Sequence, residues 1–241
     1  MMRFTTMKTK LRKYPSIFLI LLLAISSCFL TGCVNQHPKD SKKSSQGESV
    51  ETMLEITDPK EKQAVLNAKA KVKALSGNPR IVATSPAVAD ICDKLDLDLV
   101  GVPKSSVSKI PSRYKKVKKV GLAMSPDMEI VSSLNPDWIL APSSLETDLK
   151  PKFEELKNTE YAFLNLRSVQ GMYRSAQELG EIFGKQQEAE KMTKEFTTFY
   201  KSYTKRNKNK KHPKVLVLMG LPGSYVIATE NSYIGSLVKL A

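Results

Sequence analysis

Short apolar segments alternate with helical segments from residue 80 to residue 164, and this alternation limits the possible fold more than any other feature. The predicted strands are aliphatic and cover residues 80–83, 97–102, 138–141 and 161–164. The predicted helices lie between them and cover residues 87–95, 126–134 and 149–156. Repeated strand–helix alternation is typical of a mostly parallel sheet covered by helices, so the pattern predicts the α/β class.

Two of the predicted helices begin with capping signals. Ser85 is a candidate N-cap and Pro86 fits the first helical position, where its missing N–H costs nothing. The dipeptide Ser125-Pro126 has the same form, and Glu129 would complete a capping box. Both dipeptides are therefore predicted to start helices.

Residues 168–206 break the alternation. They contain no proline and keep their apolar residues at helical spacing, which predicts a single long helix of the kind that bridges two lobes. A buried strand over Val215–Met219, a second strand over Tyr225–Ala228 and a helix from Tyr233 are expected to follow. Because the sequence stops just as that helix begins, we expect an incomplete second lobe over residues 207–241.

The N-terminal segment, residues 1–32, begins basic and turns apolar, as secretory signals do. Its apolar run is shorter than the ~20 residues that cross a membrane comfortably. The sequence Leu30-Thr-Gly-Cys33 resembles the bacterial lipobox. That resemblance implies that Cys33 carries a lipid and becomes the first residue of the mature protein, which is held at the extracellular face of the cell membrane. Residues 33–78 would then form a polar tether followed by a helix over 58–75.

Charge and cysteine content narrow the function classes. The net charge is +14, of which the signal segment supplies five, so the rest keeps an excess that attracts anionic surfaces or a carboxylate-bearing ligand. An exported protein without zinc-finger or RNA-recognition patterns is not expected to bind nucleic acid. Cys92 is predicted to be a buried free thiol, and His37 and His212 to be solvated without metal-ligand spacing. Lacking a nucleophile elbow or a phosphate-binding glycine loop, the chain is not predicted to be an enzyme.

Five stretches of the chain carry a family resemblance. They begin at Arg80 (RIVATSP), Val120 (VGLAMSPDME), Leu134 (LNPDWIL), His212 (HPKVLVLMGLPGSY) and Ser232 (SYIG). From Arg80 to Ala241 the chain resembles the solute-binding proteins of iron-complex ABC importers, and within them the Isd-type haem-binding lipoproteins of Gram-positive bacteria. The resemblance implies a two-lobed α/β protein, with an N-terminal lobe over 79–167, an inter-lobe helix over 168–206 and the start of a C-terminal lobe over 207–241.

The resemblance also implies a mechanism without covalent chemistry. A monomer would receive ferric haem from cell-wall relay proteins, hold it between the lobes and deliver it to a membrane permease driven by an ATPase. In the subgroup a methionine of the first lobe and a histidine of the second hold the iron. Met124 matches the methionine, and its neutral, soft thioether suits haem iron. The histidine is expected beyond Ala241, and His212 does not replace it.

The haem propionates are expected to meet backbone N–H groups at a helix start and a nearby turn. The matching positions are Ser85, Pro86, Ala87, Ser105 and Ser106. Proline has no N–H to donate, so the hydroxyl of Ser85 or the next amides would have to replace that donor. For the two serines after the second strand, a plain turn is the competing interpretation.

Two other functions stay open. The same fold could bind a ferric siderophore or cobalamin, in which case Arg167 or Arg80 would grip an anionic group. The chain could instead be a surface lipoprotein without a transport role, although no internal repeats indicate one. The basic run 113–119 fits either the steering of an anionic ligand, the docking of a donor, or simple solvation.

Overall fold

The computed structural model describes residues 50–241. The predictions of a signal over residues 1–32, of a lipidated Cys33 and of a polar tether therefore lie outside the described residues.

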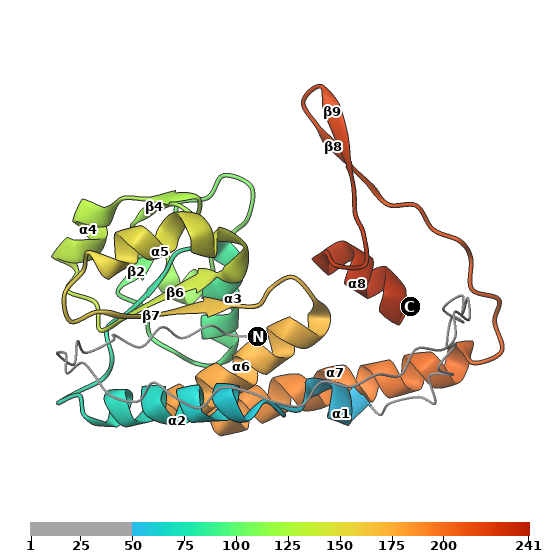
Figure 1. Ribbon diagram of the computed structural model, residues 1–241, viewed down its shortest axis with the longest axis horizontal. Helices are drawn as coiled ribbons and strands as arrows, with labels where there is room; N and C mark the ends of the chain where they lie inside the picture. The colour runs from blue at the N-terminus through green and yellow to red at the C-terminus, as the bar shows by residue number, and fades with distance from the viewer. Residues whose placement is uncertain (1–49) are drawn as a thin grey trace, which may run out of the picture. The chain divides into compact units, whose positions relative to one another are not determined.

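A five-stranded parallel sheet, which includes β2, β6 and β7, forms the centre of the first half of the chain (Figure 1). Its strand order is β3-β2-β1-β6-β7. Its strands are β1 Ile81–Ala83, β2 Gly101–Val102, β3 Lys118–Lys119, β6 Trp138–Pro142 and β7 Glu160–Leu164. The predicted α/β class is confirmed. The second strand is shorter than the predicted 97–102, and the two-residue edge strand β3 was not predicted.

Helices cover both faces of this sheet. These helices are α2 Pro59–Lys73, α3 Pro86–Lys94, α4 Met128–Ser133, α5 Glu146–Glu154, α6 Val169–Phe183 and α7 Gln186–Asn207, and the short α1, Val50–Leu54, packs on α6 and α7. Because strand side chains alternate, Trp138 and Leu140 pack with α2, α3, α6 and α7, whereas Ile139 and Phe163 pack with α4 and α5. Each face thus closes its own apolar core. Single-turn 3-10 helices occur at Ser112–Tyr114 and Ser143–Leu145.

Strand β1 is the topological switch point of the sheet. From β1 the chain moves outward to β2 and β3, and it then returns to the other side of β1 with β6 and β7. All five strands run in one direction, so their carboxyl ends share one edge of the sheet. In open α/β sheets this edge, next to the switch point, is where ligands bind.

The predicted helix start at Ser125-Pro126 is wrong. These two residues form strand β5, which pairs antiparallel with β4, Gly121–Leu122. The N-cap of α4 is Asp127, whose carboxylate accepts the amides of Glu129 and Ile130, both at 3.1 Å. A carboxylate two residues later in the chain therefore takes the capping role that the sequence pattern gave to the serine.

The predicted single helix over 168–206 is also wrong, because it is divided into α6 and α7. Gly184 follows α6 in the left-handed region, with φ at 70°, and its N–H donates to the carbonyl of Gly180. This is the usual glycine C-cap, which reverses the chain so that α7 packs back against α6. The 22-residue α7 is the long helix that leads to the C-terminal segment.

The C-terminal segment contains a hairpin and a helix. Strands β8, Leu218–Leu221, and β9, Ser224–Ile227, pair antiparallel, and α8, Tyr233–Leu240, follows with Ser232 as its N-cap. The predicted buried strand over Val215–Met219 is wrong, because the strand begins three residues later and lies open. Leu216 is 69% exposed, for example, and every described residue of β9 is exposed.

Within residues 50–241, no helix combines the length and the apolar character that a membrane span requires.

Candidate functional site

Three loops that follow adjacent strands meet at the carboxyl edge of the sheet. The loop after β1 begins at Thr84, whose N–H donates to the carbonyl of Leu140 in β6 at 3.0 Å. The third loop is the β4–β5 hairpin, which follows β3. The loop after β2 is tied to this hairpin, because the N–H of Lys104 donates to the carbonyl of Gly121 at 2.6 Å. The structure therefore brings the predicted residues of all three loops to the edge where this fold places its ligands.

Met124 lies at the turn of the β4–β5 hairpin. The hairpin begins at Gly121, whose φ of 95° favours glycine, and a Cβ there would come within 2.9 Å of the amide nitrogen of Asp127. That same amide donates to the carbonyl of Val120 at 2.8 Å and closes the base of the hairpin. Met124 is 74% exposed and Leu122 is 58% exposed. The thioether is therefore not a core group, and it is available to a ligand at this edge.

The start of α3 offers fewer donors than the sequence suggested. Ser85 is buried, and its Oγ accepts the amide of Val88 at 3.3 Å, so the hydroxyl serves as the helix cap. Pro86 has no N–H, and the amide of Ala89 donates to the carbonyl of Ser85 at 3.0 Å. These bonds leave the amide of the exposed Ala87 as the first-turn donor that the cap does not use.

Of the two serines after β2, one has a structural partner. The Oγ of Ser105 accepts the amide of Ser108 at 2.9 Å, which fits the interpretation as a turn. Ser106 is exposed. Of the five predicted anion-binding positions, Ser106 thus keeps a free hydroxyl at this edge and Ala87 keeps an exposed amide.

The two arginines considered for an anionic ligand differ in their surroundings. Arg80 lies at the opposite end of β1, where its guanidinium donates to the carbonyls of Leu134 and Asn135 and so caps the end of α4. Arg167 follows β7 and lines a polar pocket of about 550 Å³ together with Ser143 and Lys150. Only Arg167 is therefore placed near the carboxyl edge.

Cys92 and His212 are both predicted to take no part in this site. Cys92 is fully buried in α3, and burial raises the pKa of its thiol to about 12, so the prediction of an inert core cysteine is confirmed. His212 is exposed in the segment before β8. No cluster of metal-binding side chains is found in residues 50–241.

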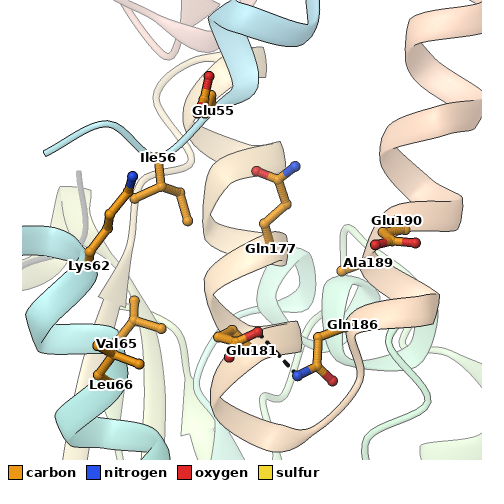
Figure 2. A pocket seen from close by; sticks show the side chains of 10 residues that line it. All are labelled: Glu55, Ile56, Lys62, Val65, Leu66, Gln177, Glu181, Gln186, Ala189 and Glu190. Carbon is orange, nitrogen blue, oxygen red and sulfur yellow. Dashed lines mark hydrogen bonds between the residues drawn. The ribbon is translucent and has the colours of Figure 1, made fainter. Parts of the chain in front are cut away.

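A second cavity was not predicted from the sequence. Its volume is about 470 Å³, and Figure 2 shows its walls: Ile56 after α1, Val65 and Leu66 of α2, Gln177 of α6 and Ala189 of α7. Carboxylates of Glu55, Glu181 and Glu190 also line it, and Glu181 accepts a hydrogen bond from Gln186 at 3.1 Å. No predicted site residue lines this cavity, so it is separate from the candidate site.

Comparisons with known proteins identify similar chains. A curated relative from Staphylococcus aureus, named high-affinity heme uptake system protein IsdE, is 41% identical over 167 residues, which are 69% of this chain and 56% of the relative. A solved ABC transporter substrate-binding protein from Listeria monocytogenes shares 46% identity at a TM-score of 0.64. The structure of S. aureus IsdE complexed with heme shares 39% identity at a TM-score of 0.64. Each match covers 68% of this chain and 63% of the solved chain.

The chain thus spans a little over half the length of the curated relatives it matches. The family model described as periplasmic binding protein matches residues 81–241, which include the whole parallel sheet and the C-terminal segment. The matched proteins bind solutes and are not enzymes, as the sequence predicted. The chain belongs to the periplasmic binding protein family.

Proposed function

We propose that this chain is the ligand-binding component of an ABC importer and that its ligand is haem. The observation that carries the proposal is the placement of Met124, an exposed thioether on a braced hairpin at the ligand-binding edge of the sheet. The similarity to a relative named as a heme uptake protein, and to that protein's structure with heme, supports this choice of ligand.

The residues at the edge suit the chemistry of haem. A thioether is an accepted axial ligand of haem iron, and the neighbouring exposed Leu122 offers apolar contact to the macrocycle. The amide of Ala87 and the hydroxyl of Ser106 are the donors that would meet a propionate, with Ser85 fixing the helix start and Pro86 and Ser105 shaping the turns. We assign no second iron ligand among the described residues.

The proposal extends to location and partners. The lipobox-like sequence favours a protein anchored through Cys33 to the extracellular face of the cell membrane of a Gram-positive bacterium. A permease and its ATPase would take the ligand from the binding protein, and cell-wall haem-relay proteins would supply it. The protein would act as a monomer in this sequence of transfers.

A haemin titration followed by Soret absorbance tests the proposal. The mature chain, residues 33–241 with Cys33→Ser to prevent lipidation, is expected to bind one haemin with saturation. Met124→Ala is expected to shift the Soret band and speed haemin loss, because the iron loses its thioether. Leu122→Ala is the matched control, since it also truncates an exposed apolar side chain of the same hairpin.

The outcomes separate the parts of the proposal. If Met124→Ala leaves the spectrum and the rate of loss unchanged, Met124 is not a ligand of the iron. If both variants change the spectrum equally, the hairpin contributes only apolar contact. Failure of folded 33–241 to bind haemin would refute the proposal that the groups at this edge hold haem without a further ligand.

A ferric siderophore is the second candidate, and the pocket of Arg167 favours it. Arg167 and Lys150 line about 550 Å³ of polar space at the carboxyl ends of β6 and β7, where cations could hold carboxylates. Titration with a ferric citrate-type siderophore, followed by quenching of the fluorescence of Trp138, tests this candidate. Binding that is lost in Arg167→Gln and kept in Met124→Ala would favour the siderophore over haem.

A further inference from the structure

Met124 is the most exposed methionine of the described residues. It is 74% exposed, and Met219 of β8 follows with 47%. The remaining methionines of residues 50–241 are all partly buried: Met53, Met128, Met172 and Met192. A small oxidant in solution therefore reaches the sulfur of Met124 more readily than any other thioether in this part of the chain.

No exposed thiol within residues 50–241 competes for such an oxidant. Cys92 is fully buried, and burial raises the pKa of its thiol to about 12. Oxidation of cysteine requires an accessible sulfur with thiolate character, and Cys92 has neither property. Within the part of the chain that the structure describes, Met124 is thus the sulfur most open to oxidation.

The chemistry of this oxidation is simple and reversible. Hydrogen peroxide converts a methionine thioether into a sulfoxide. The sulfur bonds to one peroxide oxygen and loses two electrons, while the O–O bond breaks and the other oxygen leaves as water. Methionine sulfoxide reductases restore the thioether. The step needs no catalytic group of the protein, because exposure of the sulfur is sufficient.

The hairpin that carries Met124 can accept the added oxygen without unfolding. Its base is closed by the amide of Asp127, which donates to the carbonyl of Val120 at 2.8 Å. The amide of Lys104 donates to the carbonyl of Gly121 at 2.6 Å and holds the hairpin from the side. Neither bond involves the side chain of Met124, so an oxygen on its sulfur faces water and displaces no packed group.

We propose that Met124 is a reversible oxidation site and that its sulfoxide form no longer holds the iron of the ligand. The inference rests on the proposed function and deepens it, because it assigns a redox control to the thioether on which that function depends. The thioether sulfur is a soft, neutral donor, whereas a sulfoxide presents a polar oxygen that water hydrates. Oxidation is therefore expected to release haem, and reduction to restore its capture.

The experiment treats the haemin-free mature chain, residues 33–241 with Cys33→Ser, with hydrogen peroxide and then removes the peroxide with catalase. Peptide mass spectrometry follows the oxygen gained at each methionine over time. Haemin is then added, and its transfer to an excess of apomyoglobin, followed by Soret absorbance, gives the rate of haemin loss. One portion of the oxidised protein is treated with methionine sulfoxide reductases before haemin is added.

Two variants and one stability measurement serve as controls. Met219→Leu removes the other exposed thioether, so its haemin loss should accelerate on oxidation as in the parent. Met124→Leu keeps an apolar side chain without sulfur, so its haemin loss should be the same before and after peroxide. Urea unfolding should give the same free energy for the untreated and the oxidised parent, because the added oxygen lies at an exposed turn.

The outcomes separate the site from its effect. Oxygen gained first at Met124, with haemin loss as fast as in Met124→Ala and slowed again by the reductases, would support the inference. Earlier oxidation of any other methionine would overturn the assignment of the site. Unchanged haemin loss after complete oxidation of Met124 would overturn the control of binding.

Failure of the proposed function gives a different result. An untreated parent that does not bind haemin would refute haem binding by the groups at this edge, and the control of that binding with it. The order in which the methionines are oxidised is measured without any ligand, so the assignment of the oxidation site is still decided in that case.

Discussion

The carboxyl group of Glu178 gives the clearest test of the packing between α2 and α6. Glu178 lies on α6 with 1% of its surface exposed, and Glu61 of α2 is 7% exposed and adjacent to it. Burial, and then the neighbouring Glu61, raise the pKa of Glu178 to about 9, while Arg174 opposes the shift. The folded protein therefore keeps a proton on Glu178 at neutral pH.

The sign of the effect on stability follows from proton binding. An exposed glutamate in the unfolded chain has a pKa of about 4.3, so above pH 5 the unfolded state releases a proton that the folded state keeps. The free energy of unfolding should then fall with rising pH, by up to about 1.4 kcal/mol per pH unit. Between pH 5 and pH 8 this reaches at most about 4 kcal/mol.

Glu178→Gln removes this dependence, because glutamine is neutral in both states. Urea unfolding at pH 5, 6, 7 and 8 should show a falling free energy for the parent and a flatter curve for the variant. Glu181→Gln is the matched control on the same helix. Its ion pair with Lys69 and the bond from Gln186 lower the pKa of Glu181, so it titrates below this pH range and the parental slope should remain. An unchanged slope in Glu178→Gln would refute the reasoning.

Two further predictions concern a helix cap and a thiol. Asp127→Ala should lower the free energy of unfolding by about 1 kcal/mol in urea, because two amides of α4 lose their acceptor. Asp148→Ala, an exposed change in the first turn of α5, is the control, and an equal loss there would assign the effect to the helix dipole. In the mature Cys33→Ser chain, Cys92 should not react with Ellman's reagent at pH 8 until urea unfolds the protein, because it is fully buried with a raised pKa. Reaction at the rate of a free thiol in the folded protein would contradict the buried position.

The first lobe could be predicted from sequence where local signals and burial agree. Helix α2 begins at Pro59 after the N-cap Asp58, and α3 begins at Pro86 after Ser85, as their residues indicate. Strand β6 was predicted within one residue, since its five residues are buried on both faces and read as one apolar run. In these places propensity, capping and core packing point to the same structure.

The predictions failed where contacts between residues far apart in the sequence decide the structure. Ser125-Pro126 has the form of a helix start, but its pairing with β4 holds it extended. Gly184 lies inside a helical pattern, and only the packing of α7 against α6 shows that the chain reverses there. Val215 and its neighbours are as apolar as a core strand, and no local signal could show that they are exposed.

The candidate site could be predicted only in part. The motif placed Met124 near a ligand, but its exposure depends on the hairpin, which the sequence did not indicate. The Ser85 cap agrees with the sequence pattern, whereas the capping of α4 by Arg80 depends on bonds that only the folded chain displays. The cavity of Figure 2 is formed by the connection after α1, α2, α6 and α7, and no single stretch of sequence contains it.

The open apolar surface of β8, β9 and α8 has a consequence for the behaviour of this chain in solution. Leu218, Tyr225, Ile227 and Ile234 are among the exposed residues there, and both long edges of the hairpin are unpaired. Molecules that carry a net charge of +14 repel one another in dilute buffer, which keeps such surfaces apart. Salt shortens the range of that repulsion and leaves the apolar attraction in place. The colloidal stability of the chain is therefore set by ionic strength, and added salt should favour its self-association.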